Sequence, residues 1–224
     1  RCTLSSTMAA LSRGSLVSGK MDADTPAMFI TGVDERGVAV TDILIFRPEV
    51  GLVNVALAGS SGVSAAIFPY RQLQPQDIDG DGCIEIPRPE DTWSADQTDG
   101  LVSWLRCVDD GQLAIAGQTY HSTSCGWYLT VPASWWAWNV EASTTGIQNE
   151  NQFTMTINGD PVLSIYTITG ENRETRGRMG TRIVLRRQTA TVYAAELYDA
   201  GVYYGMNEEL LRKSFSLITG SWIN

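Results

Sequence analysis

Residues 77–87 read DIDGDGCIEIP, a sequence that predicts a tight acidic loop. Asp77, Asp79 and Asp81 stand at alternate positions, and glycines at positions 80 and 82 let the backbone turn tightly around a shared centre. Carboxylate oxygens spaced in this way are the hard donors that Ca²⁺ prefers in proteins. The predicted calcium ligands are the carboxylates of Asp77, Asp79, Asp81 and Glu85 and the backbone carbonyl of Cys83.

The residues that follow this loop favour a strand over a helix. An EF-hand closes its loop with a glutamate at position 12, between two helices, whereas position 12 here is Arg88. Ile84, Ile86 and Pro87 do not continue a helical pattern, and the acidic closure falls on Glu85. We therefore expect the loop to join two strands. An acidic turn without a metal is the alternative.

Turn-forming residues recur at intervals of about 8–12 residues, which is typical of a β-rich fold. Four strands are expected before the loop, at 27–33, 38–46, 52–57 and 63–70. Together they would form about one propeller blade. Beyond the loop, further strands are expected at 101–108, 112–120, 126–132, 153–157, 162–169, 182–187 and 191–197. One C-terminal helix is expected at 207–218, capped by Asn207 and with Leu211 and Phe215 on its apolar face.

The polar, proline-containing segment 87–100 is the expected domain boundary. The predicted fold class is β-rich α+β with two domains. Residues 1–90 form a propeller-blade-like β region that ends in the calcium loop, and residues 91–224 form an antiparallel-sheet domain with the C-terminal helix.

Composition narrows the class of protein. The chain has 224 residues, of which 43% are hydrophobic and 18% charged, as in a globular protein. The net charge of −9 argues against nucleic acid as a partner. No apolar run approaches the roughly 20 residues of a membrane span. Because the chain begins at Arg1, we expect a processed protein or a fragment of a longer one.

The cysteines Cys2, Cys83, Cys107 and Cys125 do not have zinc-site spacing, and His121 is the single histidine. Cys107 and Cys125 flank an expected hairpin, so a disulfide between them is favoured in an exported protein. Free buried thiols are the alternative.

Four segments occur in an order that resembles the C-terminal half of uncharacterised exported proteins, often lipoproteins, of Gram-positive bacteria. These segments are DIL at 42–44, DIDGDGCIEIP at 77–87, GWYLTVP at 126–132 and IYTITGEN at 165–172. The loop itself resembles that of FG-GAP and VCBS propeller repeats. The resemblance implies an extracellular or cell-surface setting, upstream blades in the same parent protein, and a lipid anchor on a longer parent. Residues 126–135 also resemble the opening strand of PsbP-like α/β/α domains.

Two other groups of residues suggest binding. The tryptophans at 135, 136 and 138 concentrate aromatic surface, and Trp136 is the candidate for stacking on a sugar ring; core packing is the alternative. Arg178, Arg182 and Arg186 form a candidate anion-binding site for a cell-wall polymer, the alternative being a solvated turn. No residues form a recognisable catalytic motif around His121.

The sequence therefore predicts a non-enzymatic, calcium-stabilised extracellular binding or scaffold module of a bacterial surface protein. Its partner would be a protein or a cell-wall polymer. The alternative is a carbohydrate-active enzyme or its glycan-binding accessory domain.

Overall fold

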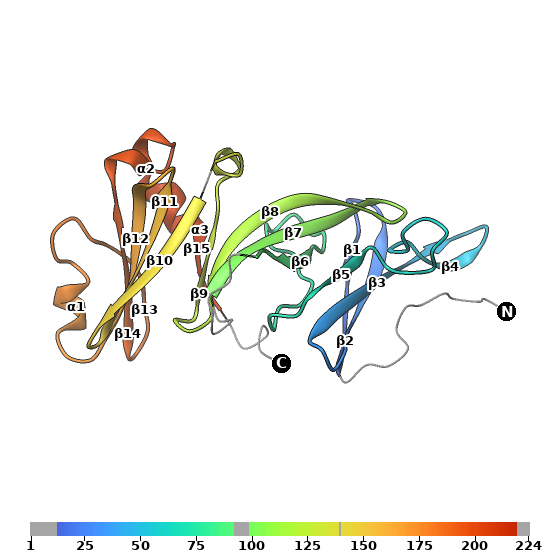
Figure 1. The fold of residues 1–224 in the computed structure, drawn as a ribbon, viewed down its shortest axis with the longest axis horizontal. Coiled ribbons are helices and arrows are strands. Elements are labelled where there is room, and N and C mark those ends of the chain that lie inside the picture. Colours follow the sequence, from blue (N-terminus) through green and yellow to red (C-terminus); the bar gives the residue numbers. More distant parts are fainter. Residues whose placement is uncertain (1–12, 92–98, 139, 219–224) are drawn as a thin grey trace. The chain divides into compact units, whose positions relative to one another are not determined.

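A computed structural model describes residues 13–91, 99–138 and 140–218 (Figure 1). The chain forms two compact units: unit 1 lies before Tyr120, and unit 2 spans Tyr120–Ile218. Most elements are strands in antiparallel sheets, which confirms the β-rich fold class. Within the described ranges, no helix has the length and apolarity needed to cross a membrane.

The first sheet of unit 1 is an antiparallel meander in the order β1-β2-β3-β4, with β5 also paired to β3. β4 pairs with the end of β3 and β5 with its beginning, so the two short strands share one edge of β3. The strands expected at 27–33 and 38–46 are confirmed, whereas β1 was not predicted. The strands are β1 Arg13–Lys20, β2 Pro26–Val33, β3 Val38–Arg47, β4 Gly51–Asn54 and β5 Ala66–Pro69.

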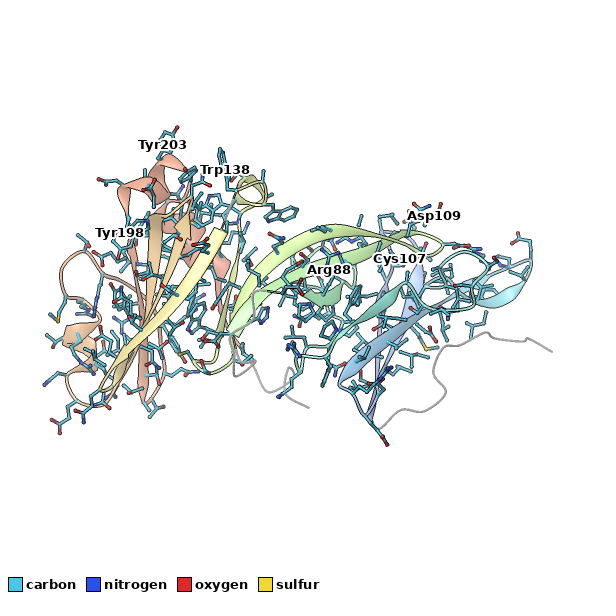
Figure 2. All side chains as sticks on the ribbon, viewed as in Figure 1. Arg88, Cys107, Asp109, Trp138, Tyr198 and Tyr203 are labelled. Carbon is cyan, nitrogen blue, oxygen red and sulfur yellow. The ribbon has the colours of Figure 1, made fainter. Side chains whose placement is uncertain are left out.

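The expected hairpin is present as β7 Asp99–Asp109 and β8 Gln112–Ser122, and β6 Ile86–Pro89 pairs antiparallel with β7. Arg88 and Cys107 mark β6 and β7 in Figure 2. This pairing joins segments on both sides of the expected boundary at 90/91. The two units instead divide between residues 119 and 120, inside β8. The polar composition of 87–100 therefore does not coincide with the division between the units.

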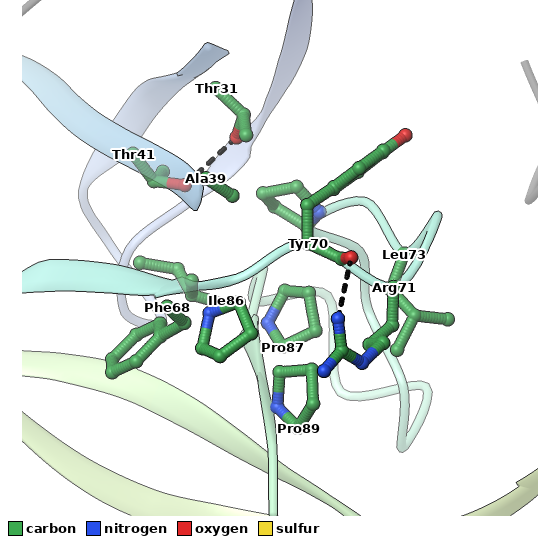
Figure 3. Close-up of a pocket in the computed structure, with 12 residues that line it drawn as sticks. Thr31, Ala39, Thr41, Phe68, Tyr70, Arg71, Leu73, Ile86, Pro87 and Pro89 are labelled. Atoms are coloured by element: carbon green, nitrogen blue, oxygen red, sulfur yellow. Dashed lines mark hydrogen bonds between the residues drawn. The ribbon is translucent and has the colours of Figure 1, made fainter. Parts of the chain in front are cut away.

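A small cavity lies in unit 1 beside β2, β3, β5 and β6 (Figure 3). The hydroxyl groups of Thr31 and Thr41 lie 2.9 Å apart on one side, and Pro87 and Pro89 line another. Its volume of about 10 Å³ corresponds to roughly one water molecule. It is therefore too small for an organic ligand.

Unit 2 contains a five-stranded antiparallel sheet in the order β10-β11-β12-β14-β13. One face carries large apolar side chains: Phe153 lies on β11, and its ring is 5.2 Å from that of Trp127 in an edge-on arrangement. Trp127 belongs to a short strand, β9, that pairs with β15. The strands are β9 Trp127–Thr130, β10 Val140–Ile147, β11 Glu150–Ile157, β12 Asp160–Thr169, β13 Ile183–Arg187, β14 Thr191–Leu197 and β15 Phe215–Leu217.

The helices of unit 2 are short: α1 Arg173–Arg176, α2 Asp199–Tyr203 and α3 Glu208–Ser214. A 3₁₀ turn, η1 Ala133–Trp135, follows β9. The prediction of one helix over 207–218 is wrong at its C-terminal end. Asn207 caps α3 as expected, accepting the Leu210 N–H at 2.9 Å. Phe215, however, has an extended backbone and pairs with Leu129, so the chain leaves the helix before reaching it.

The predicted disulfide is also wrong, because Cys107 and Cys125 are both free thiols, as is Cys83. Cys107 is buried in unit 1, where its thiol lies 3.2 Å from the carbonyl oxygen of Asp109. Burial raises the pKa of Cys107 to about 11. Cys125 belongs to unit 2, and Cys2 lies outside the described residues.

Candidate metal centre

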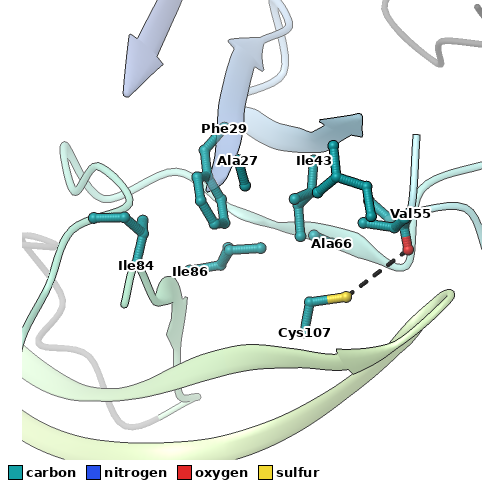
Figure 4. Packing of buried hydrophobic residues seen from close by; sticks show 10 residues of the cluster. Ala27, Phe29, Ile43, Val55, Ala66, Ile84, Ile86 and Cys107 are labelled. Carbon is teal, nitrogen blue, oxygen red and sulfur yellow. Dashed lines mark hydrogen bonds between the residues drawn. The ribbon is translucent and has the colours of Figure 1, made fainter. Parts of the chain in front are cut away.

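The loop at 77–85 is tied to unit 1 by backbone pairing and by apolar side chains. Gln76 and Glu85 form an isolated bridge with N–H···O distances of 3.0 and 2.9 Å. The N–H of Ile84 donates to the Lys20 carbonyl at 2.9 Å. Ile84 and Ile86 belong to the buried apolar cluster shown in Figure 4. The loop is therefore carried on a packed base.

The aspartates hold the turn together. Asp77 accepts hydrogen bonds from three backbone N–H groups, those of Gly80, Asp81 and Gly82, at 2.7 to 3.1 Å. Asp79 accepts a second bond from the Asp81 N–H at 3.1 Å. Gly80 and Gly82 have φ values of 82° and 88°. Only glycine adopts this left-handed backbone readily, so the two glycines make the turn possible.

Three of the predicted ligands converge. One carboxylate oxygen from each of Asp77, Asp79 and Glu85 lies within 4.8 Å of the other two. Oxygens that share a calcium ion sit about 2.3–2.6 Å from it and hence up to roughly 5 Å apart. The donor set therefore fits Ca²⁺ in chemistry and spacing. The aspartates are exposed and Glu85 is buried, so the site would open to solvent on one side.

The two remaining predicted ligands, Asp81 and the Cys83 carbonyl, are not part of the three-residue group. Asp81 lies outside the three-residue group: it accepts the Cys83 N–H at 2.8 Å, and its second oxygen faces Arg106. The Cys83 side chain is buried, and the role of its carbonyl as a ligand remains a prediction.

Arg106, on β7, contacts the loop carboxylates and was not predicted. Its Nη2 lies 2.8 Å from an Asp81 oxygen and 3.7 Å from an Asp79 oxygen. Its Nε donates to Glu85 Oε1 at 2.9 Å, and Nη2 bonds the same oxygen. The Glu85 side chain is 0% exposed and that of Arg106 is 24% exposed, so this pair is the shielded part of the network.

Burial and hydrogen bonding shift the pKa values of Glu85, Arg106 and Asp81 in different directions. Burial raises the pKa of Glu85, and the hydrogen bonds from Arg106 and from the Ile78 N–H oppose that rise. Burial alone would lower the pKa of Arg106, but Glu85 and Asp81 outweigh it and raise that pKa above its ordinary value. The pKa of Asp81 is lowered, first by the Cys83 N–H and then by Arg106. Arg106 is therefore a permanent cation beside the loop.

The three arginines proposed to bind anions have different surroundings. Arg182 forms an ion pair with Glu150 at 2.7 Å, and its guanidinium carbon lies 3.6 Å from the centre of the Tyr166 ring. Arg178 and Arg186 are exposed. Arg182 is therefore engaged within unit 2, and the exposed charge of the predicted site comes from Arg178 and Arg186.

Among the tryptophans at 135–138, the exposed side chain is that of Trp138 and not that of Trp136, the predicted sugar-stacking residue. Trp136 is half-buried, and its indole N–H donates to the Val131 carbonyl at 3.2 Å. Trp138 and Tyr203 are 47% and 84% exposed and lie at the α2 end of unit 2 (Figure 2). Tyr204 joins them, with ring centres 5.6 Å from Trp138 and 5.2 Å from Tyr203. We call Trp138, Tyr203 and Tyr204 the aromatic patch.

Comparisons with protein-family models, with curated proteins and with solved structures find no match to this chain.

Proposed function

We propose that this chain is a calcium-stabilised, non-enzymatic binding or scaffold module of a bacterial cell-surface protein. The observation that carries the proposal is the convergence of Asp77, Asp79 and Glu85 oxygens within 4.8 Å. Four carboxylates within nine residues repel one another unless cations neutralise them. An ion that binds only the folded loop would stabilise unit 1 by mass action.

The remaining parts of the proposal rest on the resemblance of the loop to FG-GAP and VCBS repeats. In this reading unit 1 is blade-like, and its antiparallel meander β1-β2-β3-β4 supports that view. The protein would act outside the cell, next to upstream blades of a lipid-anchored parent. Its partner would be another protein or a cell-wall polymer, the latter through Arg178 and Arg186. The PsbP-like architecture stays a prediction for unit 2.

Thermal unfolding tests the calcium proposal. We expect millimolar Ca²⁺ to raise the melting temperature relative to EDTA, and Mg²⁺ to do so poorly because it demands a smaller octahedral shell. Asp79→Ala should remove most of the difference. Asp79 suits this test because it accepts a single loop N–H, whereas Asp77 accepts three. Glu171→Ala, an exposed acidic position in unit 2, is the matched control. Equal melting curves with Ca²⁺ and with EDTA would rule out the calcium role.

The second candidate function is glycan binding, which the aromatic patch favours. Large exposed aromatic surface on a soluble protein commonly marks a binding site, and sugar rings stack on such faces. A glycan array should show binding that Trp138→Ala abolishes, while Trp136→Ala leaves it intact because Trp136 is half-buried. Equal loss in both variants would point away from the patch.

A further inference from the structure

Arg106 places a fixed positive charge against the carboxylates that would hold calcium. It contacts Asp79 and Glu85, which are two of the three residues whose oxygens converge, and it also contacts Asp81. Arg106 lies on β7 between Leu105 and Cys107, whose side chains are buried. Successive side chains of a strand point to opposite faces. Arg106 therefore projects from the strand face opposite to Leu105 and Cys107, the face that also carries the buried Trp104.

A calcium ion bound to the loop carboxylates would be repelled by the positive charge of Arg106. The loop carries four carboxylates, and Arg106 already neutralises one negative charge. A calcium ion held by the same carboxylates would stand only a few ångströms from the guanidinium. Like charges at that separation repel strongly where water is partly excluded. Calcium and Arg106 are therefore competitors for Asp79 and Glu85.

We propose that Arg106 is a built-in competing cation that holds the loop together without metal and lowers its affinity for Ca²⁺. This inference rests on the proposed function, since it concerns the same loop. Calcium binding would then require the guanidinium to leave Glu85. A weakened site suits an extracellular setting, where calcium modules bind at about 10⁻⁴–10⁻³ M. The contrary role, in which Arg106 orients the ligands and assists binding, predicts the opposite effect of its removal.

Calorimetric Ca²⁺ titration of the full chain distinguishes these roles. Arg106→Gln keeps a polar side chain of moderate length and removes the charge. We expect this variant to bind Ca²⁺ at least about tenfold more tightly than the unaltered chain and to melt at a lower temperature in EDTA. Arg106→Lys keeps the charge and should stay close to the unaltered affinity. Arg88→Gln removes a positive charge that pairs with Glu90 outside the loop, and it serves as the control.

The outcomes separate this inference from the proposed function. If the unaltered chain binds Ca²⁺ and Arg106→Gln binds equally or more weakly, the inference falls and the calcium proposal stands. If only Arg106→Gln binds, the inference stands and the calcium role of the unaltered chain falls. If neither binds, both fall.

A measurement on the unaltered chain tests the same inference even if the variants do not fold. The Nε–H signal of Arg106 in nuclear magnetic resonance spectra should be protected from exchange without metal, because Nε donates to Glu85. It should become exposed to solvent exchange as Ca²⁺ saturates the loop. A signal that stays protected at saturation would overturn the competition.

Discussion

At the scale of single residues, burial changes the chemistry of His121. Its side chain is fully buried on β8, and its ring stacks on Tyr128 with centres 5.3 Å apart. Burial lowers the pKa of His121 from 6.5 to about 3, because the imidazolium would lose its hydration. The unfolded chain therefore binds a proton more readily than the folded one.

The expected consequence is a loss of stability as the pH falls. Above pH 6.5 His121 is neutral in both the folded and the unfolded chain and does not affect the free energy of unfolding. Below pH 6.5, each pH unit lowers that free energy by about 1.4 kcal/mol until the folded-state pKa is reached. At pH 5 the chain should have lost about 2 kcal/mol relative to pH 8 on this account. His121→Phe keeps an aromatic ring and removes the titration. Urea unfolding at both pH values should show a loss in the unaltered chain that the variant lacks. Parallel losses in the two proteins would contradict the assignment.

The candidate site shows which residues a sequence can reveal. Asp77, Asp79 and Glu85 could be grouped from the sequence because carboxylates within one turn are close in sequence as well as in space. Arg106 was missed because it lies 21 positions beyond Glu85 and reaches the loop through strand pairing. Nothing in the local pattern around Arg106 distinguishes it from a surface arginine.

At the scale of elements, Phe215 decides how the C-terminal segment packs. Its side chain is fully buried in unit 2, with the ring 5.9 Å from that of Trp127 and 5.7 Å from that of Tyr193. Phe215→Ala should lower the free energy of unfolding by about 3–5 kcal/mol, because it leaves a cavity among these rings. Leu217→Ala, on the same short strand but only half-buried, should cost less. Chemical denaturation measures both, and a loss below about 1 kcal/mol for Phe215→Ala would show that the segment is peripheral.

Helices and strands could be predicted where apolar and polar residues alternate clearly or where turn-forming residues mark the ends of the element. β3 and β12 were placed correctly by their apolar patterns. The C-terminal helix was predicted to continue too far because Leu211 and Phe215 are spaced as on one helical face. In the structure Phe215 pairs with Leu129, and this tertiary contact is not visible in the local helix propensity of the sequence. β10 was missed because, apart from the half-buried Val140, its side chains are exposed and give no core-facing pattern.

At the scale of the whole molecule, the β-rich character followed from turn spacing and composition. The division into units did not, because a polar segment such as 87–100 looks the same in sequence whether or not strands pair across it. β6 and β7 do pair across it, which keeps both flanks in unit 1. The loop at 77–85 therefore lies inside unit 1.

Calcium binding by the loop can be observed directly by following its backbone amide signals in nuclear magnetic resonance spectra during a Ca²⁺ titration. Gly80 and Gly82 donate to Asp77, so their signals report on that carboxylate. We expect these signals to shift until they saturate at one ion per chain, with the shifts centred on residues 77–85 and extending to Arg106. Signals that stay fixed, or that drift without saturation across the acidic surface, would contradict a calcium site in this loop.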